Sequence, residues 1–131
     1  MAVGALTDSM SYVPSKRNVS LARRRVARLL ADWGSPELAG DAALLAGELA
    51  ANALLHGGVP DRLFRVELRL EDKTLRIAVT DPRGELLPRQ REAGDEEQHG
   101  RGLAIVAALA TRWGVDPLVV GKTVWAELEL C

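Results

Sequence analysis

Residues 48–56 read E-L-A-A-N-A-L-L-H and place three polar side chains, Glu48, Asn52 and His56, at fourfold spacing. Positions four apart lie one above another on a helix, so these side chains would form a polar row beside a face of Leu and Ala. Such a row is either the solvent side of an ordinary amphipathic helix or one wall of a binding site. The surrounding chain decides between the two.

The helix that carries this row has start and stop signals at both ends. In Ser35-Pro36-Glu37, the Ser can accept a hydrogen bond from the first turn, the Pro suits the first helical position and the Glu suits the positive end of the dipole. Gly57-Gly58, followed by Pro60, ends the helix. The sequence therefore predicts a helix from about residue 35 to residue 56.

An earlier segment, from about Ser15 to Trp33, also has apolar residues at helical spacing, and Gly34 ends it. Its polar positions include a cluster of arginines at 23, 24, 25 and 28. This cluster is either a solvated helix face or a patch that binds a partner. Before it, residues 6–14 end at Pro14 and predict a short strand at a sheet edge.

The segments after the second helix alternate between apolar and charged residues, as Leu63 to Leu70 and Leu75 to Thr80 do on either side of the turn Glu71-Asp72-Lys73. This alternation predicts an antiparallel sheet with one covered face and one wet face. The remaining predicted elements are a helix from Leu103 to about Trp113-Gly114 and strands around Val115 to Val120 and from Thr123 to Leu130.

A long polar stretch, residues 82–100, follows the second of these strands. Irregular loops of more than about 12 residues are usually functional lids or dispensable inserts. Gly100, Arg101 and Gly102 come next, directly before the Leu103 helix. Glycines there expose the free N–H groups of the helix, which with the dipole suit a phosphate.

Together these features describe a nucleotide pocket. Asp81, at the end of a strand, can accept a hydrogen bond from the amine of a base. Asn52 can hold Mg²⁺ through its carbonyl oxygen, and Glu48 can take a proton from an attacking hydroxyl.

The composition excludes several other classes of protein. The 131 residues make one domain, and a formal net charge of −1 gives no global attraction to nucleic acid or to an anionic membrane. The N-terminus lacks a signal-peptide pattern, and the single cysteine, Cys131, excludes an internal disulfide. We therefore expect a cytoplasmic protein that binds neither nucleic acid nor membrane.

Two nucleotide motifs are also excluded by spacing. Gly121-Lys122-Thr123 resembles the end of a P-loop, but Asp116 stands where the first Gly is needed and the segment enters a strand. Gly100-x-Gly102 has Ile105 in place of the third Gly of a dinucleotide fingerprint.

Three boxes in this order resemble those of the GHKL (histidine-kinase-like) ATPases. E-L-A-A-N-A-L-L-H-G resembles the N box, V-T-D-P-R-G-E stands in the place of the G1 box, and H-G-R-G-L-A-I-V is similar to the G2 box. The terminal G-K-T-V-W-A-E-L matches the last strands of that family. The resemblance spans about Tyr12 to Leu130 and is closest to the stand-alone serine-kinase anti-sigma factors of actinobacterial type.

The resemblance implies an α+β two-layer sandwich of the Bergerat type, with a mixed, mostly antiparallel sheet and about three helices on one face. Residues 1–131 would form one ATP-binding domain, and residues 82–100 its lid. The resemblance implies that Glu48 is the general base and that Asn52 binds Mg²⁺. The residues that it implies for ATP binding are Asn52, Asp81, Gly84, Gly100, Arg101, Gly102, Leu103 and Thr123. His56 would brace the edge of the pocket.

The resemblance further implies a serine protein kinase that binds a sigma factor, or phosphorylates an anti-anti-sigma protein, and that is able to form a homodimer. The alternative is a non-catalytic module that binds nucleotide and a partner without phosphoryl transfer. The G1 box departs from the family pattern, because Arg83 and Glu85 replace two glycines and only Gly84 remains. Ala104 replaces a further glycine in the G2 box.

Overall fold

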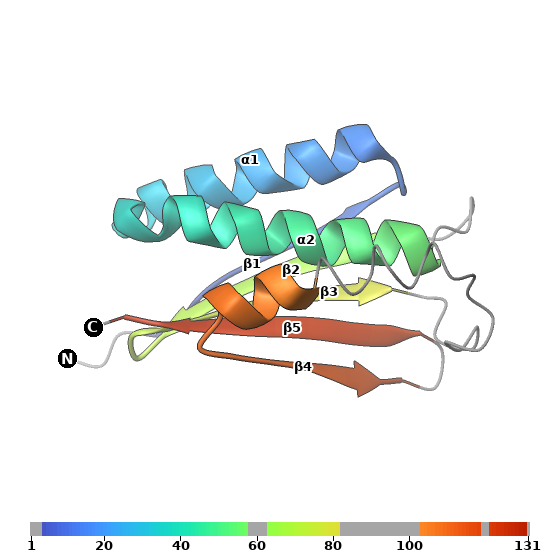
Figure 1. The fold of residues 1–131 in the computed structure, drawn as a ribbon. Helices are drawn as coiled ribbons and strands as arrows, with labels where there is room; N and C mark the ends of the chain where they lie inside the picture. Colours follow the sequence, from blue (N-terminus) through green and yellow to red (C-terminus); the bar gives the residue numbers. More distant parts are fainter. Residues whose placement is uncertain (1–3, 58–62, 82–102, 119–120, 131) are drawn as a thin grey trace.

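An antiparallel sheet carries helices on one of its faces (Figure 1). The computed structural model describes residues 4–57, 63–81, 103–118 and 121–130. In chain order the elements are β1 (Leu6–Tyr12), α1 (Lys16–Asp32), the 3₁₀ helix η1 (Pro36–Leu38), α2 (Ala39–Gly57), β2 (Phe64–Glu71), β3 (Thr74–Asp81), a helix at residues 103–109, β4 (Arg112–Pro117) and β5 (Lys122–Glu129).

The strands pair in the order β1-β2-β3-β5-β4, and every pairing among the described residues is antiparallel. The last strand in the sequence, β5, therefore lies between β3 and β4. Helix α2 packs across β2, β3 and β5, and α1 packs on α2. These layers confirm the α+β sandwich predicted from the sequence.

The core lies between the covered face of the sheet and the helices. Alternate residues of each central strand point into it, as in β3, where Leu75, Ile77 and Val79 are buried. Leu45 and Leu49 of α2 meet them from the other layer. Full burial of such a side chain contributes about 1.5–3 kcal/mol, so this contact holds the two layers together.

Helix α1 begins at a side-chain cap. The Ser15 hydroxyl accepts a hydrogen bond from the backbone N–H of Asn18 at 3.0 Å, and Ser15 itself has extended backbone angles. The bond satisfies an N–H group that has no partner inside the helix.

Replacing Ser15 by Ala is expected to lower the free energy of unfolding by about 1 kcal/mol (roughly 0.5–2) because this N–H then loses its acceptor. Urea unfolding followed by circular dichroism measures the change. Ser35→Ala is the matched control, since Ser35 also precedes a helix but its hydroxyl makes no cap bond. Equal losses in the two variants would contradict the capping role of Ser15.

The junction between α1 and α2 differs from the sequence prediction. Ser35 was expected to cap one continuous helix, but η1 intervenes and the Leu38 N–H donates to the backbone oxygen of Ser35. The Ser35 N–H donates back to Leu30 O at 2.9 Å, and Gly34 N–H donates to Ala31 O with φ +86° at Gly34. This Schellman closure of α1 fixes the backbone of Ser35, which leaves its side chain out of the capping geometry.

The predicted end of the Leu103 helix is also wrong. Trp113 and Gly114 were expected to close that helix, yet both lie in β4, and the helix spans residues 103–109. The pairing of β4 with β5 begins at Arg112, three residues before the predicted strand start at Val115. Just before it, the Thr111 N–H donates to Glu127 O at 2.7 Å.

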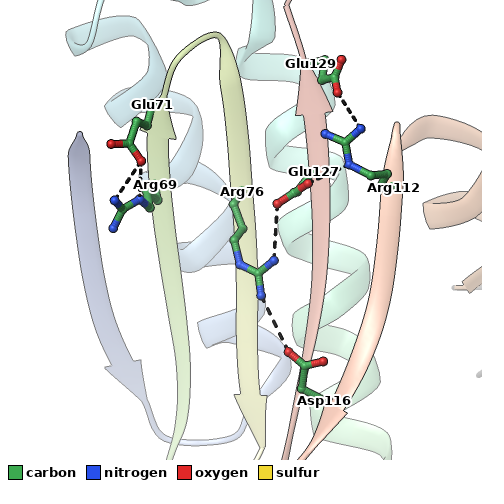
Figure 2. A network of polar contacts seen from close by, with 7 residues as sticks. All are labelled: Arg69, Glu71, Arg76, Arg112, Asp116, Glu127 and Glu129. Atoms are coloured by element: carbon green, nitrogen blue, oxygen red, sulfur yellow. Dashed lines mark hydrogen bonds and ion pairs between the residues drawn. The ribbon is translucent and has the colours of Figure 1, made fainter. Parts of the chain in front are cut away.

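The face of the sheet opposite the helices is solvated, and its charges are paired both between strands and, for Arg69 and Glu71, within β2 (Figure 2). The Arg76 guanidinium lies 4.5 Å from the centroid of the Trp125 ring and 3.4 Å from Glu127. Arg112 bonds the same carboxylate from the other side at 2.9 Å. Gly114 lies against the indole ring of Trp125. A Cβ at residue 114 would come within 2.8 Å of this ring, so a larger residue there would need the ring to move. Solvent-accessible ion pairs contribute about 0–1 kcal/mol each, so these pairs add little to the stability of the sheet.

Candidate nucleotide site

Two buried polar side chains mark the candidate site. Within the described residues the buried polar or charged residues are Ser35, Asn52 and Asp81, which are 9%, 5% and 1% exposed. The helix junction accounts for Ser35. Burial of a carboxylate or an amide is unfavourable unless hydrogen bonds or a paired charge compensate, so such residues are uncommon in a core. Both Asn52 and Asp81 are residues that the sequence predicts for the site.

Helix α2 supplies Asn52 from its inward side. Leu45, Leu49 and Asn52 follow one another at spacings of four and three, so all three lie on the face that packs against the sheet. Glu48, one turn before Asn52, is half-buried at the edge of that face. The predicted polar row thus separates into an inner amide and a more accessible carboxylate. His56 lies in the last turn of α2, and its side chain falls outside the described residues.

Strand β3 supplies Asp81 as its last residue. The alternation that buries Ile77 and Val79 also turns Asp81 toward the helices. Helix α2 packs across β3, and the C-terminal end of α2 lies at the same end of the domain as the end of β3 (Figure 1). The amide and the carboxylate therefore come from two facing layers at one end of the core.

The structure adds Lys122, which the sequence reasoning missed. Lys122 is the register partner of Asp81 in the β3–β5 pair, and it shares the covered face with Val124 and Ala126. Register partners have Cβ atoms about 4.5–5.5 Å apart. A cation therefore stands beside the buried carboxylate. The period-two pattern of the last strand was the signal that could have found it.

Thr123 lies on the opposite face from Asp81. Its hydroxyl is 2.9 Å from the hydroxyl of Thr80, and either one can be the donor. Both face the open side of the sheet, where Thr123 helps to line a concavity of about 660 Å³ together with Arg76 and Asp116. The structure thus places Thr123 on the other face of the sheet from Asp81, and its role near the base stays a prediction.

The phosphate side of the site is described only in part. Leu103 begins the helix at residues 103–109, is half-buried and packs against the core, as Leu109 does. The other predicted phosphate ligands, Gly100, Arg101 and Gly102, lie outside the described residues. Gly84 of the G1 box and the predicted lid, residues 82–100, lie outside them as well.

The donor set fits a magnesium ion that is held largely by its nucleotide. Among the described residues no group of three or more His, Cys, Asp or Glu side chains could hold a metal ion by itself. Mg²⁺ usually keeps several waters and takes one or two protein oxygens plus substrate phosphates. The amide oxygen of Asn52 can be such a ligand.

Comparison with known proteins identifies the family. In the part of the chain that the structure describes, no helix has the length and apolar character needed to cross a membrane. A search of curated proteins gives no match. A sequence model of the histidine kinase-like ATPase domain matches residues 12–128, which include Asn52, Asp81 and the strands β2, β3, β4 and β5 up to residue 128, but only the last residue of β1. The chain belongs to the histidine kinase-like ATPase domain family.

Proposed function

We propose that this protein binds ATP and Mg²⁺ and acts as a regulatory serine protein kinase of the anti-sigma type. The main observation in support of a nucleotide site is that Asn52 and Asp81 are buried at one end of the core. Both side chains are polar, and both lie within the residues that match the histidine kinase-like ATPase domain.

Each residue has a distinct role in binding. The Asp81 carboxylate accepts a hydrogen bond from the exocyclic amine of adenine, and the Lys122 ammonium lies on the same face. Asn52 provides an oxygen ligand for Mg²⁺, and the ion when bound neutralises charge on the phosphates. The start of the Leu103 helix, with Gly100, Arg101 and Gly102, serves the phosphates through N–H groups and positive charge. Gly84, the glycine that remains in the G1 box, is a further proposed nucleotide-binding residue.

Glu48 acts as the general base of the proposed transfer. Its half-buried carboxylate takes the proton of a serine hydroxyl on the partner protein. The serine oxygen then bonds to the γ-phosphorus while the bond to the bridging oxygen breaks, and ADP leaves with that electron pair. Positioning and charge neutralisation supply most of the acceleration of such a step.

The proposed partners are a sigma factor and an anti-anti-sigma protein that competes with it. The three boxes in family order, closest to those of stand-alone serine-kinase anti-sigma factors, support this proposal. Both proposed partners regulate transcription, so we expect the protein to act in the cytoplasm. Capture of partners from the native cell with and without ATP would identify them.

Replacing Glu48 by Gln is expected to slow phosphoserine formation on the captured antagonist by about 10²–10⁴-fold, because the proton acceptor is lost. The dissociation constant for Mg-ATP should stay within about threefold of wild type, since the amide keeps the shape of the side chain. Phosphate transfer from labelled ATP and calorimetry measure the two quantities.

Asp41→Asn is the matched control, because Asp41 is an exposed acid in the first turn of the same helix. It should transfer phosphate at the wild-type rate. If Glu48→Gln transferred phosphate at the wild-type rate, Glu48 would not be the general base. ATP-dependent capture of a partner with no transfer by the wild type would instead establish the non-catalytic module.

A further inference from the structure

One face of α1 presents an ordered row of cations to solvent. Arg17, Leu21, Arg24 and Arg28 follow at spacings of four, three and four, which keeps them on a single helix face. All four are exposed, and Leu21 is 40% exposed. We refer to these four residues as the α1 stripe.

The arginines of the α1 stripe differ from the other arginines of the domain in their surroundings. The ion pairs of the described residues use the arginines at 25, 65, 69, 76 and 112. Within the same residues none of those pairs includes an arginine of the stripe. The acid of α1 itself is Asp32, in its last turn. The stripe therefore offers uncompensated positive charge.

The charges of α1 also oppose the helix dipole. Lys16 and Arg17 occupy its first turn, which contains no acid, and Asp32 lies near its C-terminal end. Anions favour the N-terminal end of a helix and cations the C-terminal end, so this arrangement weakens the helix. The helix dipole therefore gives no stabilising reason for cations at the start of α1, where Arg17 of the stripe lies.

A hollow next to the stripe offers an apolar contact. It lies between α1 and α2, has a volume of about 260 Å³, and is lined by Ser20, Arg23, Arg24, Ala27 and Ala43. The Arg23 side chain lies close against α2 because residue 47 is a glycine, where a Cβ would come within 2.6 Å of Arg23 Cδ. Small side chains with arginines beside them suit an aliphatic side chain flanked by carboxylates.

We propose that the α1 stripe binds an acidic amphipathic helix of a partner protein. From Arg17 to Arg28 the stripe spans about 16 Å, or three turns, which matches a partner helix with acids at the same spacing. Leu21 and the hollow provide apolar contacts that a phosphate backbone does not use. The formal net charge of −1 gives no wider positive field for nucleic acid or an anionic membrane.

The α1 stripe is independent of the proposed nucleotide site. None of the residues that we assign to ATP, Mg²⁺ or proton transfer lies on α1. A failure of nucleotide binding would therefore leave this proposal standing, and a failure of the stripe would leave the nucleotide site standing.

The probe is a fluorescent helical peptide of 16 residues with Glu at spacings of four, three and four along one face and Leu beside them. Its control is a peptide of the same composition with the acids distributed around the helix. The patterned peptide is expected to bind wild-type protein at least about 10-fold more tightly than its control, with affinity falling as salt rises. Fluorescence anisotropy measures both.

The double variant Arg24→Glu, Arg28→Glu should lose at least about 10-fold in affinity for the patterned peptide. Arg65→Glu is the matched control, because Arg65 is exposed and pairs with Glu67 on the open face of the sheet; it should bind as wild type does. Circular dichroism and Mg-ATP binding check that each variant is folded.

Three results would overturn the proposal. They are equal binding of the two peptides, no binding of the patterned peptide up to about 1 mM, and equal loss in Arg65→Glu and the double variant. Tighter binding of a DNA duplex or of phosphatidylserine vesicles through Arg24 and Arg28 would assign the stripe to that ligand and reject the acidic helix.

Discussion

Replacing Asn52 by Ala is expected to weaken Mg-ATP binding by about 10- to 100-fold, the equivalent of about 1.5–3 kcal/mol for an interaction with a charged group. Asn52 is 5% exposed on the inner side of α2, and its amide oxygen is the metal ligand of the proposed site. Alanine is the best helix former, so α2 should persist and the loss should be confined to the ligand. Calorimetric titration with Mg-ATP measures the dissociation constant.

The other asparagine of the sequence, Asn18, provides a matched control. Asn18 lies on α1, where its side-chain amide donates to the backbone oxygen of Val13 at 2.8 Å. Asn18→Ala should bind Mg-ATP as wild type does. With EDTA present, wild type and Asn52→Ala should differ less than with Mg²⁺. An unchanged dissociation constant in Asn52→Ala would contradict the role of Asn52 toward the metal.

Replacing Phe64 by Ala is expected to lower the free energy of unfolding by about 3–5 kcal/mol, a large share of the roughly 5–15 kcal/mol typical of a domain. Phe64 opens β2 and is 2% exposed. Its ring stacks on Tyr12, the last residue of β1 and its register partner, with centroids 5.4 Å apart. The variant therefore leaves a cavity at the point where the edge strand joins the sheet. Guanidinium unfolding measures the loss.

Phe64→Leu separates the cavity from the ring contact. Leucine keeps most of the buried volume and loses the stacking with Tyr12, which is worth about 0.5–1.5 kcal/mol beyond area burial. We therefore expect a clearly smaller loss than in Phe64→Ala. If the two variants lost the same free energy, stacking and not volume would be the larger contribution of Phe64.

Local patterns were sufficient for much of the fold. The alternation of residues 63–70 and 75–80 predicted β2 and β3 to within one residue at each end, and the turn at Glu71-Asp72-Lys73 is present with φ of +52° at Asp72 and +64° at Lys73. Positive φ at two successive turn residues matches the right-handed twist of a two-residue hairpin. These features depend on neighbours in the sequence.

Local patterns also placed two of the predicted site residues in the core. Asn52 was predicted from helical spacing and Asp81 from its position at a strand end, and both are buried. Thr123 was carried over from the family motif and lies on the open face, whereas alternation in β5 places Lys122 on the covered face beside Asp81. The roles of all these residues toward a nucleotide stay predictions.

The sequence by itself determined where β2 and β3 lie and which faces of the strands and helices are apolar, because periodicity of 2 or 3.6 is a property of consecutive residues. Only the tertiary structure decided that β5 lies between β3 and β4, that Lys122 stands opposite Asp81, and that Trp113 belongs to a strand. Those outcomes depend on backbone hydrogen bonds between separate segments, which lie 41 residues apart for Asp81 and Lys122 and 13 residues apart for Trp113 and Ala126. Such pairings form only when the layers pack, and no local pattern encodes them.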